Sequence, residues 1–227
     1  MDFGHEIVFY LFDYPIRDTV VSTWIMMALI TGLAIWIGKR EPVALEMLFD
    51  FLNDTISDVM GRSGENFLTL LGSLAIFIAF ANVIGIVPFL MSPTSDINTT
   101  IALALVVFVS VHYFGIRAQG LLGYIKSLAN PIFLLPLEII GQLSRTLSLT
   151  LRLFGNIFSG ELIVAIIFAL IPLFVPLPLA GLSVFTGLLQ AYIFTILASV
   201  YIAAGVETTE SNPKKIRINS EEIKCKT

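Results

Sequence analysis

The chain alternates long apolar runs without charge with short segments that carry most of the charged residues. Three such runs, at 19–38, 66–91 and 97–116, contain no Asp, Glu, Lys or Arg. Each has about the ~20 residues that an α-helix needs to cross the ~30 Å hydrocarbon core of a bilayer. The pattern therefore predicts three membrane-spanning helices in the first half of the chain.

Residues 41–61 follow a different pattern, with apolar and acidic positions on opposite faces of one helix. The apolar positions are Leu45, Leu48, Phe49, Leu52, Ile56 and Val59, and the acidic ones are Glu46, Asp50, Asp54 and Asp58. This pattern predicts an amphipathic helix on the membrane surface or against a protein. An acidic face lacks the usual attraction to anionic lipid, which favours a protein partner. A simply solvated acidic face is the open alternative.

Two further apolar segments, 131–171 and 179–206, are separated by Pro172, Pro176 and Pro178. Proline interrupts helices, so these segments predict a hairpin of two helices. Both exceed the ~20 residues of an upright span, which indicates strong tilt. The remaining residues, 207–227, form a polar tail that is basic overall.

The sequence thus predicts an all-α integral membrane protein with a single membrane domain, about five membrane helices and one amphipathic surface helix. Its orientation follows from basic residues, which favour the cytoplasmic side. Lys39 and Arg40, Arg117 and Lys126, and the tail mark the inner side. We therefore expect the N-terminus outside and the C-terminus in the cytoplasm.

Composition agrees with a membrane protein and excludes several other classes. The chain is 56% hydrophobic and 13% charged, with a mean hydropathy of +0.90, outside the soluble range. A net charge of -4 without a basic stripe argues against nucleic acid. The single cysteine, Cys225, predicts neither a disulfide nor a metal site, and no cofactor is expected. The N-terminus has no basic region before an apolar run, so we expect no cleaved signal peptide.

The predicted hairpin contains four charged residues, Glu138, Arg145, Arg152 and Glu161. Each charge at the bilayer centre costs about 2.5–3.5 kcal/mol, so their presence requires a reason. The first three are spaced by seven residues, which places them on one helix stripe roughly 10 Å apart. Glu161, nine residues after Arg152, falls on nearly the opposite side. Three uncharged polar residues lie close to the stripe: Gln142, Ser148 and Asn156.

Three interpretations of this stripe remain open. Glu138 could pair with Arg145 while Arg152 caps a carbonyl or reaches the headgroups. The stripe could line the aqueous path of a channel or transporter, or it could form a buried ion-pair scaffold without transport. A separation of seven residues is long for direct pairing on a helix, which weakens the first interpretation and favours the aqueous path.

The segment LSLTLRLFGNIFSGELI, at 147–163, closely resembles the F-type ATP synthase a subunit, the Fo stator subunit of the ATPase subunit 6 family. The resemblance covers about 41–205 and includes three further segments. They are NVIGIVP at 82–88, PTSDINTTIALAL at 93–105 and LLQAYIF at 188–194. The resemblance implies one membrane span, a surface helix, a hairpin of two spans, and two long tilted helices against a rotor ring.

The resemblance also implies roles for single residues. Arg152 resembles the family's essential stator arginine, with Asn156 and Gln190 as polar residues beside it. Glu161 and Glu138 resemble half-channel acids. Further candidates for the ion path are Arg145, Ser144, Ser148, Gln142 and Asn98. Some family members carry a histidine a few residues before the glutamine of the last helix, but the sequence around Ser183 has none. His112 is expected to be a satisfied interfacial histidine and not a proton relay.

The function implied is ion translocation through two aqueous half-channels to the carboxylates of a rotor ring, coupled to rotation and ATP synthesis. Either protons or sodium ions fit the sequence. The implied partners are the c-subunit ring, the peripheral-stalk b subunits, the rest of the F1Fo complex and membrane lipid. The implied location is the bacterial plasma (inner) membrane.

No G-x-x-x-x-G-K-[ST] phosphate loop occurs in the sequence, so we expect the chain not to be an enzyme by itself. Two other functions stay open. A secondary transporter would show inverted repeats and interrupted helices, which we do not find in the sequence. A noncatalytic membrane scaffold is the third possibility.

Overall fold

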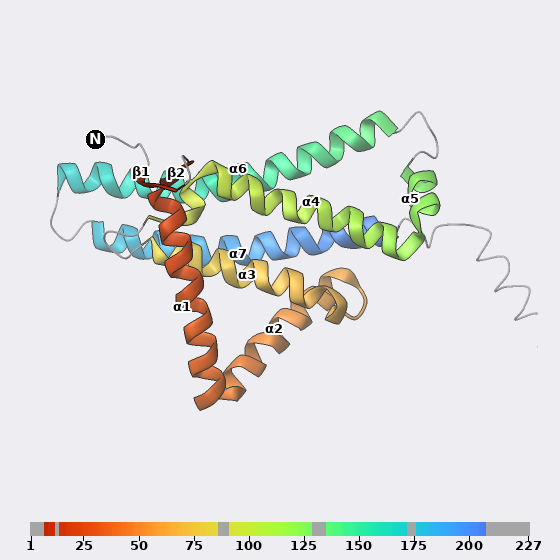
Figure 1. The fold of residues 1–227 in the computed structure, drawn as a ribbon, viewed down its shortest axis with the longest axis horizontal. Helices are drawn as coiled ribbons and strands as arrows, with labels where there is room; N and C mark the ends of the chain where they lie inside the picture. Colours follow the sequence, from red (N-terminus) through yellow and green to blue (C-terminus); the bar gives the residue numbers. More distant parts are fainter. Residues whose placement is uncertain (1–6, 12–13, 86–90, 129–134, 172–175, 208–227) are drawn as a thin grey trace, which may run out of the picture.

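The computed structural model of the chain describes residues 7–11, 14–85, 91–128, 135–171 and 176–207. Two short strands come first and helices follow (Figure 1). The elements are β1 (Ile7–Leu11), β2 (Tyr14–Arg17), α1 (Asp18–Arg40), α2 (Pro42–Met60), α3 (Glu65–Ile84), the 3₁₀ turn η1 (Pro93–Ser95), α4 (Ile97–Gln119), α5 (Leu121–Leu128), α6 (Leu135–Leu170) and α7 (Pro176–Glu207).

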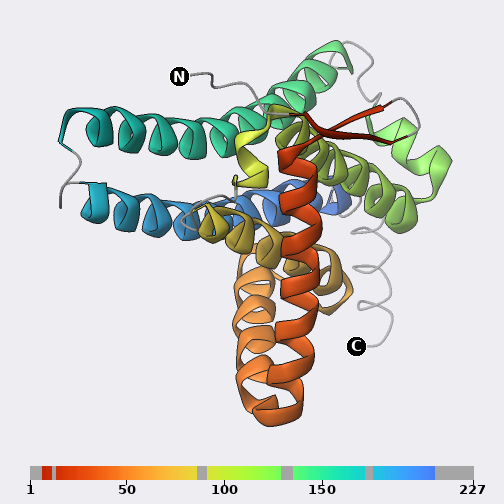
Figure 2. The same cartoon turned by 60° about the vertical axis from the view of Figure 1, so that its left-hand side comes forward.

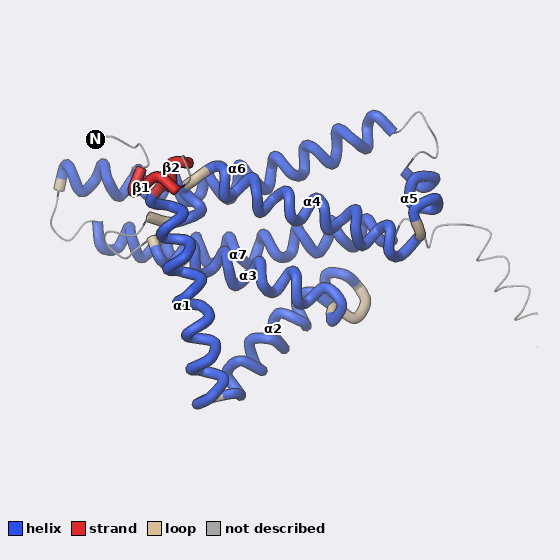
Figure 3. The backbone as a smooth tube through the Cα atoms, viewed as in Figure 1, coloured by secondary structure: helices blue, strands red, loops and turns tan. Residues whose placement is uncertain are grey.

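Five of these helices, α1, α3, α4, α6 and α7, are long and apolar enough to cross a membrane. With the amphipathic α2, they confirm the predicted fold class of an all-α integral membrane protein. The sequence did not predict the antiparallel hairpin of β1 and β2, in which Ile7 pairs with Arg17 and Leu11 with Tyr14 (Figure 3). This hairpin leads directly into α1 and leaves the helical architecture unchanged.

The helices form two groups that cross steeply. In Figure 1, α3, α4, α6 and α7 run alongside one another, while α1 crosses them and α2 returns from its far end. Figure 2 shows the same crossing from another side. With 36 and 32 residues, α6 and α7 are about 54 and 48 Å long, more than the ~30 Å of hydrocarbon. Since α1 crosses this hairpin steeply, an upright α1 requires α6 and α7 to be tilted.

Some element bounds differ from the sequence-based ranges. The helix predicted at 66–91 ends at Ile84, and α7 starts at Pro176 rather than at 179. Proline is tolerated in the first helical turn because an N–H there has no partner within the helix. Between Arg117 and Lys126, which the sequence analysis places on the inner side, the short helix α5 begins after a turn at Gly120 with φ 73°. Several expectations fall outside the described residues, namely those on Pro88, 131–134, Pro172, Cys225 and the tail at 208–227.

The second half of α2 packs against the helical bundle. Leu52, Ile56 and Met60 are buried, with α3 and α7 as the neighbouring helices. The four acids of its polar face are all exposed, which matches the amphipathic pattern. Leu48 and Phe49 in the first half also stay exposed to the surroundings of the chain.

The core lies between α2, α3, α4, α6 and α7. Phe194 and Ile202 of α7 and Leu153 of α6 are fully buried there. The buried apolar positions on α6 are Leu149, Leu153 and Ile157, spaced by four residues along one face. This spacing fixes which side of α6 faces the bundle and which side is left for polar residues.

A close contact between Asn82 of α3 and Gly187 of α7 joins the two helices. The Asn82 side-chain Nδ2 donates to the Gly187 carbonyl over 2.8 Å, and its Oδ1 accepts from the Thr94 hydroxyl at 2.8 Å. A Cβ added at Gly187 would lie only 2.7 Å from the Asn82 Cβ. Glycine is therefore required at 187 for this approach of α3 to α7.

We expect Gly187→Ala to destabilise the chain by about 1–3 kcal/mol because the added methyl forces α3 and α7 apart. Gly181→Ala is the matched control, since a Cβ there would meet nothing within 4 Å. That variant should be neutral or more stable by up to about 1 kcal/mol. The measurement is the thermal midpoint of the detergent-extracted chain, and equal midpoints for both variants would contradict the packing role of Gly187.

Candidate functional site

The charged residues of the hairpin lie along α6, which positions them relative to the core. Its buried face, Leu149, Leu153 and Ile157, packs inward, so Arg152 projects from the side not used for packing. Seven residues separate Arg152 from Arg145 and nine separate it from Glu161, or about 10 and 14 Å along the axis. The polar residues thus form three groups, centred on Arg145, Arg152 and Glu161, which we name the inner, middle and outer group after the orientation expected from the sequence.

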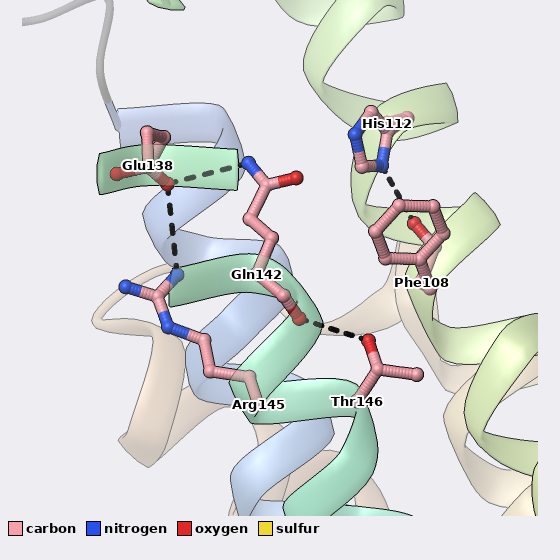
Figure 4. A network of polar contacts seen from close by, with 6 residues as sticks. All are labelled: Phe108, His112, Glu138, Gln142, Arg145 and Thr146. Carbon is pink, nitrogen blue, oxygen red and sulfur yellow. Dashed lines mark hydrogen bonds and ion pairs between the residues drawn. The ribbon is translucent and has the colours of Figure 1, made fainter. Parts of the chain in front are cut away.

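The inner group contains Glu138, Gln142 and Arg145, drawn in Figure 4. Gln142 Nε2 donates to Glu138 Oε1 at 3.2 Å, and Arg145 Nη1 lies 3.9 Å from the same oxygen. Glu138 and Arg145 thus approach each other despite the seven-residue separation that weighed against their pairing. Helical side chains lean toward the N-terminus, and the long arginine side chain spans the two turns. The pair is loose, because both side chains are more than 40% exposed.

Two tyrosines adjoin the inner group. The Arg145 guanidinium lies over the Tyr201 ring of α7, 5.7 Å from its centroid. Tyr124 of α5, outside the membrane-spanning helices, is buried against α4. Its burial and, secondarily, the charge of Glu138 raise the pKa of the Tyr124 phenol, which therefore stays neutral at physiological pH. The inner group is thus bordered by α5 and α7 while its two charged side chains stay partly exposed.

The middle group centres on Arg152, whose side chain is exposed on the surface of the chain. Among the residues that the structure describes, no hydrogen bond or ion pair involves its guanidinium. Ser144 and Ser148 are exposed on α6 as well. Because an arginine cannot lose its charge, an uncovered guanidinium at this depth requires water or an anionic partner.

Two amides, Asn156 on α6 and Gln190 on α7, add donors to the middle group. Asn156 Nδ2 and Gln190 Nε2 are buried, and neither has a hydrogen-bond partner within the described part of the chain. Buried polar atoms in proteins are nearly always paired. These amide donors are therefore suited to bind a group that the chain itself does not provide, such as water or a carboxylate.

The outer group lines a cavity of about 340 Å³ between α3, α6 and α7. Glu161 faces it, and its Oε1 lies 3.8 Å from where a Cβ on Gly85 would stand. Much of the remaining wall consists of small or apolar side chains, and its uncharged polar residues are Asn82, Ser92 and Ser183. The cavity has room for several water molecules beside the carboxylate.

Two candidate residues, Asn98 and Glu161, lie apart from the polar residues of the inner and middle groups. Asn98 is exposed and hydrogen-bonds through Nδ2 to Asp96 Oδ1 at 2.9 Å, where Asp96 caps the start of α4. It does not border the outer cavity. Nor does it border a second cavity of about 20 Å³ between α4, α6 and α7, which we call the inner cavity and which is lined in part by His112, Gln142, Arg145, Thr146 and Tyr201. Glu161 lines the outer cavity, whereas Glu138 does not, so the two acids are not brought together.

Three polar residues of the outer cavity, Asn82, Ser92 and Ser183, were not among the sequence-based candidates. A signal existed for Asn82, because an amide within a charge-free membrane run is costly unless it is used. Ser92 and Ser183 carried no comparable signal, since serine is common in membrane helices and turns.

Comparison with known proteins agrees with this arrangement. The model of the family described as ATP synthase A chain matches residues 20–203. The chain is 44% identical to ATP synthase subunit a 2 of Bradyrhizobium sp. strain BTAi1, over 88% of this chain and 93% of that protein. It is 43% identical to ATP synthase subunit a 2 of Picosynechococcus sp. strain PCC 7002, over 96% and 97%. With ATP synthase subunit a of Moorella thermoacetica it shares 39% identity over 86% and 94%. The chain therefore belongs to the ATP synthase A chain family.

Proposed function

We propose that this chain is the ion-translocating stator subunit of an F-type ATP synthase, with one aqueous half-channel on each side of Arg152. The observation that carries the proposal is the division of polar groups along α6. Glu161 lines the outer cavity, Glu138 and Gln142 lie at the opposite end, and the exposed Arg152 stands between them. An ion that enters one half-channel then has to pass from the polar groups of α6 to a partner subunit before it reaches the other half-channel.

The partner proposed is a ring of c subunits, each with one carboxylate that carries an ion. A loaded carboxylate is neutral and can face lipid, whereas an ionised one cannot. The fixed guanidinium of Arg152 favours the ionised form of an approaching carboxylate and so releases its ion. The unpaired amides of Asn156 and Gln190 are suited to hold that carboxylate or its water.

Ring rotation then joins the two half-channels without an open pore. A rotor site loads from one half-channel, turns through the lipid and unloads beside Arg152 into the other. Each charge driven across 100 mV supplies about 2.3 kcal/mol, which becomes torque. The chain performs no chemistry on ATP itself, which we assign to other subunits of the complex.

The proposed setting is the bacterial plasma membrane, with the N-terminus outside and the C-terminus in the cytoplasm. Lys39 and Arg40 end α1 and Arg117 lies in the last turn of α4, so the inner ends of both helices carry basic residues. In this orientation Glu138 lies on the cytoplasmic side and Glu161 on the outer side. Peripheral-stalk b subunits and lipid are the partners proposed for the exposed apolar surface of α1 and α2.

We expect Glu161→Gln to lower ion-driven ATP synthesis at least about tenfold, because the amide cannot exchange an ion with the outer cavity. Glu161→Asp keeps the charge and should retain more activity. Glu65→Gln, at the exposed start of α3, is the matched control and should leave synthesis unchanged. The measurement is synthesis per assembled complex in membrane vesicles, and equal rates for Glu161→Gln and the control would remove Glu161 from the ion path.

Arg152 provides the sharpest test of the proposal. Arg152→Ala should abolish ATP synthesis, and the assembled complex should leak ions because a loaded rotor site can pass between the half-channels without unloading. Arg152→Lys should also lose synthesis, since lysine has no planar fork and loses its proton more readily on burial. Synthesis and passive ion flux are measured in vesicles with equal amounts of complex.

The control for these variants is Arg62→Ala, which removes an exposed arginine between α2 and α3 and should behave as the unaltered chain. Normal synthesis by Arg152→Ala would sink the proposed role of this residue. Loss of synthesis without any rise in passive flux would contradict the proposed role of Arg152 in keeping the two half-channels separate.

A further inference from the structure

A third cavity, of about 210 Å³, lies where α3 begins and where α4 and α7 end. Its described wall consists of Asn66 and Phe67 of α3, Phe114, Arg117 and Ala118 of α4, and Val206 of α7. None of these wall residues belongs to the ion path proposed above. The third cavity therefore calls for an explanation other than ion translocation.

Contacts among the three helices hold the wall of this cavity in place. The Phe67 and Phe114 rings meet edge to face, with 4.7 Å between their centroids. Phe67 belongs to the buried core of the bundle, and Phe114 packs against that core. Gln119 Nε2 donates to the Gly205 carbonyl oxygen at 3.3 Å and joins the ends of α4 and α7. The packing of the chain itself thus shapes the cavity.

The position of the cavity along the chain places it at the surface of the membrane. Asn66 is the first residue of the charge-free run at 66–91, and Arg117 directly follows the charge-free run at 97–116. The ends of such runs mark the border between the hydrocarbon core and the headgroup region. A group bound in the third cavity therefore lies at the level of the lipid headgroups.

The polar part of the wall is suited to a phosphate group. Arg117 is its one charged residue, and no hydrogen bond or ion pair joins the Arg117 guanidinium to another residue that the structure describes. An arginine fork binds phosphate oxygens through two parallel hydrogen bonds. Asn66 adds an amide donor from α3. The adjacent acid, Glu65, is exposed and is not part of the described wall, which holds no carboxylate to attract a cation.

The apolar part of the wall distinguishes a lipid from a free phosphate ion. Phe67, Phe114, Ala118 and Val206 offer a surface that an inorganic ion would leave uncovered. The glycerol backbone and first acyl carbons of a phospholipid would cover this surface and remove it from water. The ammonium group of a zwitterionic headgroup would meet repulsion from Arg117. A phospholipid with a net negative charge therefore fits both parts of the wall.

We propose that the third cavity binds the headgroup of an anionic phospholipid, with Arg117 and Asn66 on its phosphate and the apolar wall against its glycerol backbone. Basic pockets between membrane helices are known sites for such headgroups. The bound lipid contacts α3, α4 and α7 together and stabilises the ends of these helices against one another. This inference does not depend on the path that ions take.

The test uses phosphatidylglycerol that carries a photoreactive diazirine on its headgroup. This probe is mixed in increasing fractions into phosphatidylcholine vesicles that contain the assembled complex. After illumination the chain is digested, and the probe attached to the first turn of α3 is quantified by mass spectrometry. None of the substitutions changes α3, so every variant is compared on the same peptide.

Two kinds of variant separate charge from space. Arg117→Gln removes the charge, Arg117→Lys keeps the charge without the planar fork, and Ala118→Leu fills part of the cavity at unchanged charge. The matched control is Arg40→Gln, which removes an exposed arginine from the end of α1, outside the described wall. It lowers the net charge of the chain by the same amount as Arg117→Gln.

We expect attachment to saturate in the unaltered chain and in Arg40→Gln at the same probe fraction. Arg117→Gln should need about fivefold more probe for half-maximal attachment, since a basic residue near the membrane surface favours anionic lipid by about this factor. Arg117→Lys should fall between the two. Ala118→Leu should lower the maximal attachment because its side chain occupies the space of the headgroup.

Three results would overturn the inference. Identical curves for Arg117→Gln and Arg40→Gln would show that Arg117 does not bind the headgroup. A linear rise of attachment with probe fraction in the unaltered chain would show no preference over the surrounding phosphatidylcholine. Displacement of the probe by an excess of inorganic phosphate would assign the cavity to a free anion. Should Arg117→Gln fail to assemble, a curve for Ala118→Leu equal to that of the unaltered chain would overturn the inference in its place.

Discussion

The structure depends on one constraint, which is that a charge within the membrane must find water, an opposite charge or a partner. Each uncompensated charge at the bilayer centre costs about 2.5–3.5 kcal/mol. Three of the four charged residues on α6 find an opposite charge or a cavity within the chain, since Glu138 and Arg145 face each other and Glu161 faces a cavity. Arg152 alone among them lacks a partner in the described chain, and this makes it the position where another subunit has to complete the site.

The packing of the helices fixes where the charged residues of α6 lie and keeps them apart. The face of α6 that carries Leu149, Leu153 and Ile157 is buried in the bundle, and this burial sets the direction in which Arg152 projects. The close contact of Asn82 with Gly187 holds α3 against α7 at the outer cavity. Because the hairpin of α6 and α7 is longer than the membrane is thick, its polar groups can reach both sides, and Arg152 is the one charged residue between Arg145 and Glu161.

Much of this arrangement could be predicted from hydropathy and from the seven-residue spacing of Glu138, Arg145 and Arg152. The direct approach of Glu138 and Arg145 could not, because it depends on side-chain direction and length rather than on position along the helix. The outer cavity could not be predicted either, since Asn82 and Ser183 are brought to Glu161 by tertiary packing of helices distant in sequence. The β1–β2 hairpin shows the same limit, because an apolar segment interrupted by acids does not reveal its pairing.

The central claim, that Arg152 separates two aqueous regions, is tested most directly by cysteine accessibility. In a chain with Cys225 replaced by serine, a single cysteine is placed at Ser183 in the outer cavity or at Thr146 in the inner one. A charged, membrane-impermeant thiol reagent is then added to one side of sealed vesicles containing the assembled complex. If Arg152 separates the two regions, Ser183→Cys should react only from the outer side and Thr146→Cys only from the cytoplasmic side. Reaction of either cysteine from both sides would show a continuous pore through the chain and would contradict the account.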